Sequence, residues 1–470
     1  GGTEDSGRES QPYPAQAETF FFSAQKKIPH PCAKRYLCAS RADWAADSRA
    51  ERCHGGFRAE WEPFSRAERA ICAAGKNFFL ILHFTNFKKK MNFNRIICIL
   101  VLAAALVGCS KDSAITPPED TQKPGNEPYV PYTPSPAVDG RAVVAYVAYY
   151  GTTLPDPRIV THINYAFAEL YMRDGKYLGF KPQGKEARFQ SVVALKKQNP
   201  NLKVLISFTN GVSNSDNTDK DEGFSVLAKS EEMRKAFAQD CKAYCEKYGI
   251  DGIDMNWEFP GLSWGSQAKD VTADVQNHIL LMKQLRETLG NDYLLTYAGY
   301  CMDKQAVIGG YRYIDIKALD SIVDYVNIMT YDFDADGDPH NALTCSTAYW
   351  DITRTYNAYI KAGATPSKLV LGIPFYGRVS FSGSPGALSY KTIKTLGTGY
   401  TIDNWDSAAS VPYVTYGGAR YCYYDNPRSI EIKARWALER KFYGLMYWEN
   451  DSDDANFTLR RATWESVMTY

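Results

Sequence analysis

Strand-like and helix-like segments alternate from residue 141 to the last residue of the sequence. Short runs rich in β-branched and aromatic residues are followed by segments whose apolar residues recur at three- and four-residue spacing, which predicts strands followed by helices. The eight strand candidates span residues 143–151, 160–170, 203–209, 250–259, 293–300, 323–332, 368–377 and 443–450. Eight such repeats predict an α/β fold, a (β/α)8 TIM barrel.

An open, doubly wound sheet is the alternative fold for alternating strands and helices. That fold places a glycine-rich phosphate-binding turn after its first strand, and no such turn follows residues 143–151. The closed barrel is therefore the predicted fold. The alternation breaks over residues 379–424, which predicts a small inserted lobe between strands 7 and 8 of the barrel.

Polar and apolar residues alternate within DGIDMNWEFP, at positions 251–260 in the fourth predicted strand. Because successive strand side chains point to opposite faces, Asp254, Asn256 and Glu258 would line the barrel interior. Buried polar groups are costly unless they bond one another or act on a ligand. A calcium loop fits poorly, because such loops need glycine turns and exposed oxygen ligands. A purely structural polar ladder is the other alternative to a catalytic site.

Polar and aromatic residues also lie where other predicted strands end. Tyr331 and Asp332 close the sixth strand, Arg378 follows the seventh, and Trp448 and Glu449 close the eighth. The active sites of (β/α)8 barrels lie at the carboxyl ends of the strands. These residues are therefore expected to surround the same cleft as the polar residues of the fourth strand.

The segment DGIDMNWEFP resembles the motif of glycoside hydrolase family 18, the chitinase family, which in loose form is DGxDxDxE. Other segments resemble the family in the correct order, over nearly all of residues 141–470. They are AYVAYYG, NYAFAEL, NIMTYDFD, GIPFYGR and the carboxyl-terminal YYDNPRSIEIKARWALERKFYGLMYWENDSDD. Many members of the family carry an α+β lobe between strands 7 and 8, where this sequence has its insertion.

The resemblance implies a retaining glycosidase that uses one catalytic carboxylate. Glu258 would protonate the glycosidic oxygen and then act as the base toward water. The nucleophile would be the 2-acetamido oxygen of the substrate, which forms an oxazolinium. Asp254 and Asn256 would orient the acetamido group, and Tyr331 would donate a hydrogen bond to its carbonyl.

The resemblance also implies a set of substrate-binding residues. Trp448 would form the apolar floor beneath the distorted sugar ring. The other candidates are Tyr146, Phe167, Met329, Asp332, Arg378 and Asp251. Each has an alternative role in barrel packing. No cofactor or metal ion is implied, and no group of Cys and His residues has the spacing of a zinc site.

The sequence departs from the family pattern at two places. The third strand, which usually ends in Ser-x-Gly-Gly, reads SFTNG at residues 207–211, so Ser207 matches but the glycine pair does not. Asn256 stands where the family most often has Asp. Its amide can accept and donate hydrogen bonds, but it cannot carry a proton or a negative charge. We therefore expect an active enzyme with altered properties.

The leading expectation is endo-hydrolysis of β-1,4-linked N-acetylglucosamine polymers, meaning chitin or its oligosaccharides. Two alternatives remain, an endo-β-N-acetylglucosaminidase that cleaves the chitobiose core of N-glycans and a weakly catalytic surface sugar-binding protein. Acidic and basic residues are interspersed and the net charge is +1, so nothing indicates binding to nucleic acid. A monomer is expected.

The region before the barrel resembles that of an exported bacterial lipoprotein. Residues 1–90 contain no Met and no sustained periodicity, and they are interpreted as upstream sequence translated in error. From Met91, a short basic segment precedes an apolar run too short for a stable membrane helix, so residues 91–108 are predicted to be a signal peptide. The predicted lipid attachment site is Cys109. A Pro-rich tether at residues 109–140 would link it to the barrel, and an outer-membrane location is expected. A genuine amino-terminal extension with a membrane helix is the alternative.

Overall fold

The computed structural model describes residues 132–212, 223–262, 269–301, 314–333, 338–345 and 350–470. The predicted segments before residue 132, with the candidate lipidation site Cys109, lie outside these ranges. Among the described residues, no helix is both long and apolar enough to cross a bilayer.

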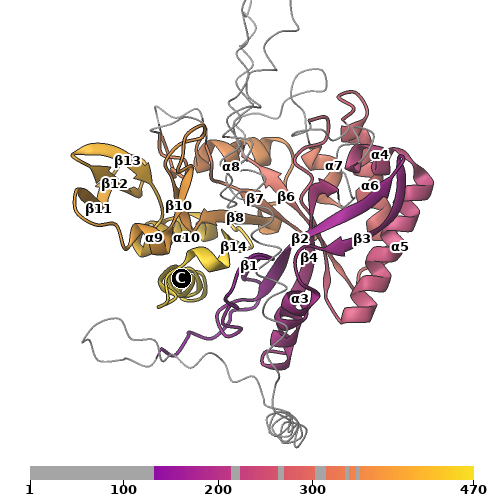
Figure 1. Ribbon diagram of the computed structural model, residues 1–470, viewed down its shortest axis with the longest axis horizontal. Helices are drawn as coiled ribbons and strands as arrows, with labels where there is room; N and C mark the ends of the chain where they lie inside the picture. The colour runs from indigo at the N-terminus through magenta and orange to yellow at the C-terminus, as the bar shows by residue number, and fades with distance from the viewer. Residues whose placement is uncertain (1–131, 213–222, 263–268, 302–313, 334–337, 346–349) are drawn as a thin grey trace, which may run out of the picture. The chain divides into compact units, whose positions relative to one another are not determined.

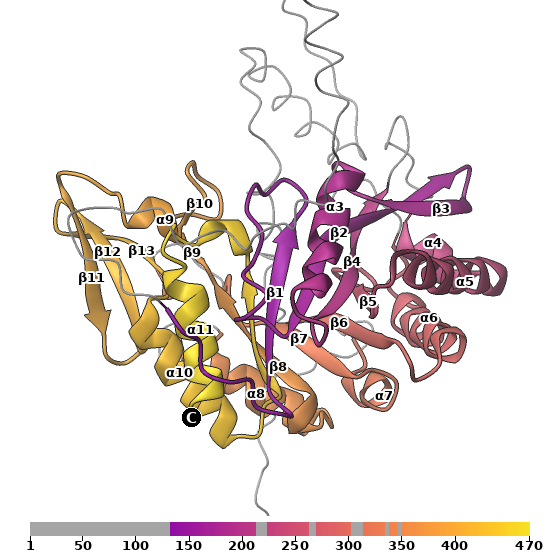
Figure 2. The same ribbon diagram turned by 90° about the horizontal axis from the view of Figure 1, so that it is seen from below.

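Eight parallel strands close into a barrel (Figures 1 and 2). Each strand pairs with its neighbours in the ring, and β1 pairs in parallel with both β2 and β14, which closes it. The strands are β1 (Ala142–Ala148), β2 (His162–Arg173), β4 (Lys203–Val212), β5 (Gly252–Met255), β6 (Leu294–Tyr300), β7 (Tyr325–Met329), β8 (Leu369–Pro374) and β14 (Gly444–Trp448). The predicted (β/α)8 barrel is confirmed.

Helices surround the barrel on its outer side, as both ribbon views show. They are α3 (Glu186–Val193), α4 (Phe224–Lys229), α5 (Glu231–Tyr248), α6 (Asp274–Leu289), α7 (Ile316–Asp320), α8 (Ile352–Lys361), α10 (Pro427–Glu439) and α11 (Thr458–Met468). Short 3-10 segments occupy Ala194–Lys197, Pro366–Lys368 and Asn450–Ser452. The side chain of Ser230 caps α5 by accepting from the Met233 N–H, and Gly249 ends it at a φ of 64°. A positive φ favours glycine, so Gly249 suits the end of this helix.

The apolar residues of β5 and the segment after it pack between the barrel and its helices. Met255 and Trp257 are buried, with 1% and 5% of their surfaces exposed. The Trp257 ring stacks on Phe224 of α4 at 5.7 Å and meets the edge of His278 of α6 at 5.5 Å. The predicted alternation of apolar and polar faces is therefore present, and it turns the intervening polar residues toward the barrel interior.

One glycine shows how closely the barrel strands approach one another. A Cβ atom at Gly252, the first residue of β5, would lie 2.1 Å from the backbone oxygen of Leu294 at the start of β6. Real Cβ contacts are essentially never that short, so a side chain here would force the two strands apart.

A β-hairpin extends one side of the barrel. Strand β2 continues beyond its parallel partners and pairs antiparallel with β3 (Lys176–Pro182). The sequence did not predict β3, since KYLGFKP contains Gly and Pro and lacks a clear period of two. Phe180 of β3 covers the outer side of the barrel, where its ring lies 4.8 Å from that of Phe208.

A second, antiparallel sheet lies between β8 and α10 in the chain and beside the barrel in Figure 1. Its strands, in spatial order, are β10 (Ala387–Ser389), β9 (Tyr376–Arg378), β13 (Ala419–Tyr423), β12 (Val411–Tyr416) and β11 (Tyr400–Asp406). Helix α9 (Tyr390–Ile393) belongs to the same segment. Because β9 follows β8 almost directly, this lobe starts at the carboxyl edge of the barrel and carries Arg378 there.

Candidate active site

The carboxylate of Asp254 lies at the centre of the barrel and is fully buried. Its Oδ2 accepts from the Tyr146 hydroxyl of β1 at 2.8 Å and from the Ser207 hydroxyl of β4 at 2.6 Å. Its Oδ1 accepts from the Thr296 hydroxyl of β6 at 2.5 Å and from the Asn327 amide of β7 at 3.3 Å. Side chains from four other strands therefore converge on this one group.

These donors decide what Asp254 can do. Burial raises its pKa, while the donors, Ser207 first, act in the opposite direction because they stabilise the charged form. A carboxylate whose oxygens are both occupied is suited to fixing its neighbours rather than to exchanging protons with a substrate.

Asn256 lies just beyond the end of β5. Its backbone N–H donates to the Phe208 oxygen of β4 at 2.8 Å, which continues the sheet pairing by one residue. Its side chain hydrogen-bonds Glu258. Its Oδ1 is buried and has no hydrogen-bond partner among the described residues. The Asn256 amide therefore engages Glu258 and holds an acceptor beside it that has no partner among the described residues.

Glu258 is partly exposed, whereas Asp254 is not. Burial raises the pKa of Glu258 to about 8, the bond from Asn256 lowers it, and the negative charge of Asp332 raises it. A carboxyl group that remains protonated at neutral pH can donate a proton to a leaving oxygen. The environment of Glu258 is therefore that of a general acid.

Tyr331 lies two residues beyond the end of β7 and is 5% exposed. Burial raises its pKa far above the usual value, and the charges of Glu258, Asp332 and Asp254 act in the same direction. Its hydroxyl thus keeps its proton and can act only as a neutral hydrogen-bonding group. Met329, the last residue of β7, is 7% exposed and contributes apolar packing to the same end of the barrel.

Asp332 and Arg378 form a buried ion pair across the carboxyl ends of β7 and β9. The Arg378 Nε donates to Asp332 Oδ1 at 2.9 Å, and its Nη2 donates to Oδ2. Burial alone would raise the Asp332 pKa, but Arg378 and the nearby His340 outweigh it, so this pKa lies below its usual value. Asp332 therefore stays ionised and places its negative charge near Glu258.

Three aromatic side chains, one each from β1, β2 and β14, pack against one another. Trp448 is the last residue of β14 and is partly exposed. The Phe167 ring stacks on it at 5.5 Å with an interplanar angle of 23°, and the Tyr146 ring lies 5.6 Å away at 56°. Tyr146 thus contacts both the Trp448 ring and the Asp254 carboxylate.

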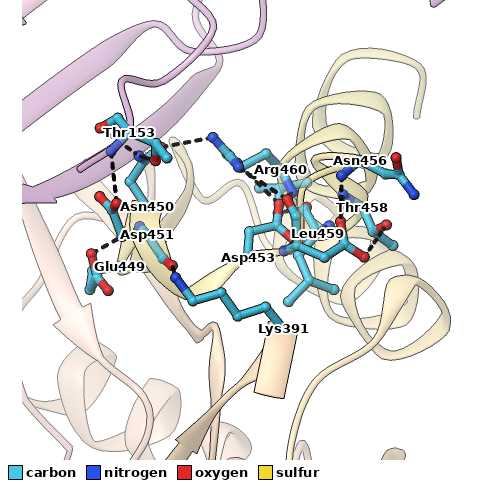
Figure 3. Close-up of polar contacts among 12 residues, drawn as sticks. Thr153, Lys391, Glu449, Asn450, Asp451, Asp453, Asn456, Thr458, Leu459 and Arg460 are labelled. Atoms are coloured by element: carbon cyan, nitrogen blue, oxygen red, sulfur yellow. Dashed lines mark hydrogen bonds and ion pairs between the residues drawn. The ribbon is translucent and has the colours of Figure 1, made fainter. Parts of the chain in front are cut away.

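The segment after Trp448 is held by a polar network (Figure 3). Asp451 Oδ1 accepts from the backbone N–H groups of Thr152 and Thr153, at 2.7 and 2.8 Å, in the loop after β1. The Lys391 ammonium of α9 donates to the Asp451 backbone oxygen. Glu449 accepts from the Asp451 N–H at 3.0 Å. Glu449 therefore serves to shape this turn, which fixes the position of Trp448.

Asp251, which was expected to bind substrate, is not brought together with the other candidate residues. It precedes β5 and therefore lies at the amino end of the strand, opposite to Glu258. Its carboxylate pairs with Lys196 at 2.5 Å and Lys203 at 3.5 Å and accepts from the Val204 N–H at 2.8 Å. It links β4, β5 and the segment after α3.

Several polar residues of the site were not singled out from the sequence. Thr296 and Asn327 bond Asp254, and each is a polar residue within an otherwise apolar strand run, LLTYAGY and YVNIM. The contrast between these polar residues and their apolar neighbours was the sequence signal that could have identified them as site residues. His340 contacts Asp332 from a segment with no recognisable pattern, so nothing in its local sequence could have indicated it.

Comparison with known proteins gives the same assignment. The profile of glycosyl hydrolases family 18 matches residues 142–453. Probable chitinase 2 of Drosophila melanogaster is 28% identical over 381 residues, covering 70% of this chain and 76% of that protein. Chitinase A1 of Niallia circulans is 32% identical over 315 residues, covering 57% of this chain and 42% of that protein.

Solved structures agree on the fold. A cell-surface-expressed, multi-modular chitinase from Paenibacillus sp. str. FPU-7 is 28% identical with a TM-score of 0.58, and the match covers 69% of this chain and 42% of that one. A variant of a class V chitinase from Nicotiana tobaccum in complex with NAG4 has a TM-score of 0.59 at 22% identity, covering 70% and 99%. The barrel, the motif on β5 and the family match together place this chain in glycosyl hydrolases family 18, as a glycoside hydrolase.

Proposed function

We propose that this chain hydrolyses β-1,4-linked N-acetylglucosamine polymers within the chain, with retention of configuration and with the substrate's acetamido group as nucleophile. The observation that supports the proposal is the pairing of two groups. Glu258 is partly exposed and has a pKa of about 8, and the side-chain oxygen of Asn256 is a buried acceptor with no partner among the described residues. The first group can act as acid, and the second can accept the N–H of an acetamido group. Related chitinases solved with N-acetylglucosamine tetramers support the substrate class.

The proposed reaction has two steps. Glu258 donates its proton to the glycosidic oxygen as the bond from that oxygen to C1 breaks, and the acetamido carbonyl oxygen bonds to C1 to form an oxazolinium. The ionised Glu258 then takes a proton from water. The water oxygen attacks C1, and the bond from C1 to the oxazolinium oxygen breaks, which restores the acetamido group. Two displacements at C1 give net retention.

Each neighbouring residue has a part that follows from its contacts. The Tyr331 hydroxyl would donate to the acetamido carbonyl, and the Asn256 oxygen would accept the acetamido N–H. Trp448 would support the sugar ring through its exposed face. Asp254, held by four donors, would fix the geometry around Asn256, since its own oxygens are already occupied.

The nucleophile determines which substrates can react. We expect N-acetyl-chitooligosaccharides to be cleaved and cellotriose, which lacks the acetamido group, to remain intact. We expect a thiazoline analogue of the oxazolinium to inhibit strongly, because transition-state-like compounds bind far more tightly than substrates. Product analysis by mass spectrometry, with a high-mannose glycopeptide in parallel, is the measurement. Cleavage of cellotriose would contradict the mechanism, and cleavage of the glycopeptide alone would identify an N-glycan-directed enzyme instead.

The role of Glu258 is tested by Glu258→Gln. The amide keeps the shape but cannot donate the proton, so the rate on a fluorogenic chitobioside should fall roughly 100-fold or more. Binding of the oligosaccharide, measured by calorimetry, should change little. A variant that keeps more than about a tenth of the activity would exclude Glu258 as the acid, and a wild type that binds the sugar without turnover would indicate a sugar-binding protein.

The role of Asn256 is tested by the pH dependence of Asn256→Asp. The acid must be protonated, so wild-type activity should decline as pH rises through about 8. In the variant, a like charge near Glu258 is added and the bond that stabilises its ionised form is lost, and both changes raise its pKa. The alkaline limb of kcat/KM should therefore move up by about 1 pH unit.

The matched control is Asn256→Ala, which removes the amide bond without adding a charge. Its alkaline limb should lie between those of the wild type and Asn256→Asp. Alkaline limbs that coincide in all three proteins would show that residue 256 does not influence the acid.

We further propose that the enzyme is exported and held at the outer membrane by a lipid on Cys109. The support is the sequence alone, from the basic start at Met91 to the Pro-rich residues 109–140. Cys109→Ala should move the protein from the membrane fraction to the soluble fraction, whereas Glu258→Gln, as control, should stay with the membranes. An unmodified Cys109 in the native protein, found by mass spectrometry, would refute the anchor.

A further inference from the structure

His340 holds the turn that follows β7 from two sides. The backbone N–H of Asp332 donates to His340 Nδ1 at 3.3 Å, and the N–H of Phe333 donates to the His340 backbone oxygen at 3.1 Å. Asp332 has a φ of 57°, a conformation that residues other than glycine rarely adopt and that costs energy unless the surroundings hold it. The two bonds from His340 are such a restraint.

The charge state of His340 fits this role. The side chain is 1% exposed and its ring lies 5.4 Å from that of Tyr376. Burial lowers its pKa, although the Asp332 carboxylate acts in the other direction. His340 Nδ1 lies 3.3 Å from the Asp332 backbone nitrogen and 3.5 Å from Asp332 Oδ1, so this one ring atom engages both the backbone and the carboxylate of Asp332. A neutral imidazole offers at Nδ1 either a lone pair to the N–H or a proton to the carboxylate.

His340 is anchored in turn by its neighbour in the chain. The Asn341 amide donates to Asp425 Oδ2 at 2.6 Å. Asp425 also forms an ion pair with Lys433 of α10 at 2.7 Å, and both side chains are completely buried. Ser429 donates to Asp425 Oδ1 at 2.6 Å. A contiguous set of bonds therefore connects α10, through the segment 340–341, to the turn at Asp332.

We propose that His340 is a positioning residue, which fixes the Asp332 carboxylate between Arg378 and Glu258, and that the buried Asp425–Lys433 pair holds His340 in place. The inference rests on the proposed function, because it assigns Asp332 an effect on the acid of that reaction. It adds that the electrostatic environment of Glu258 depends on a residue that acts on the acid through Asp332.

The direction of the effect follows from the charges that face Asp332 and Glu258. Arg378 and Tyr376 of β9 lie near Asp332, as does His340, with Asp425 beyond His340. Tyr331 and Asn256 lie near Glu258. Asp332 is the nearby anion that favours the protonated form of Glu258. If the turn relaxes and this anion withdraws, Glu258 will ionise at lower pH.

The test compares His340→Leu with His340→Asn. The leucine fills the space without an acceptor, whereas the oxygen of Asn can take the place of Nδ1. In His340→Leu we expect the alkaline limb of kcat/KM to move down by roughly 0.5 pH unit and kcat to fall by about tenfold with little change in KM. His340→Asn should restore both values toward the wild type.

A second comparison tests the anchor. The double variant Asp425→Asn with Lys433→Met removes both buried charges together, so that neither is left unpaired. Its matched control is Asp453→Asn with Arg460→Met, which removes a pair of similar burial at 3.1 Å between Arg460 of α11 and Asp453 before that helix (Figure 3). The first variant should shift the alkaline limb in the same direction as His340→Leu. The control should lower the melting temperature without shifting the alkaline limb.

Two outcomes would overturn the inference. One is a lower melting temperature in His340→Leu with an unchanged alkaline limb, which would make His340 purely structural. The other is an equal shift in His340→Leu and His340→Asn. Infrared titration of the Glu258 carboxyl band, identified by its loss in Glu258→Gln, gives the same pKa without turnover. A failure of the proposed reaction is thereby distinguished from a failure of the positioning role.

Discussion

The buried carboxylate of Asp254 is the constraint on which the barrel interior depends. Removing a charge from water costs several kcal/mol unless hydrogen bonds replace the lost hydration. Here the donors come from β1, β4, β6 and β7, so all four strands must present the right residue at the same height. A slip of one residue in any strand would turn its donor to the outer face. The polar centre therefore specifies the register of the barrel as well as the site.

The two carboxylates of the motif differ because their surroundings differ. Asp254 lies inside the barrel with four donors on its oxygens, which oppose the rise in pKa that burial causes, whereas Glu258 lies beyond the end of β5, partly exposed and with a pKa raised to about 8. These surroundings suit Asp254 to fixing its neighbours and Glu258 to proton transfer. Asn256 lies between them in the chain and adds no ionisable group. Its amide instead uses one end on Glu258 and leaves the other as an acceptor.

The fold could be predicted from the sequence because its signal is repeated eight times, and an error in one strand leaves the pattern intact. The ends of the strands were less predictable. Residues 250–259 were interpreted as one strand, yet β5 covers only Gly252–Met255, because the residues that follow leave the sheet. The candidate acid and its companions lay in one contiguous motif. His340 and Asp425 did not, since their importance arises from contacts between distant segments. Asp251 lies apart from the other candidates because the motif extends past both ends of the strand.

Buried ion pairs recur wherever a segment outside the strands must keep a fixed position. Arg378 meets Asp332 beyond β7, Lys433 meets Asp425 ahead of α10, and Arg460 meets Asp453 after β14. Such pairs contribute little net stability compared with apolar packing, but each orients its segment strongly. Segments at the carboxyl end of a barrel lack the repeated backbone bonds that fix strands, so side-chain charges have to fix them. One of these contacts, between Arg378 and Asp332, also fixes the negative charge that raises the pKa of Glu258.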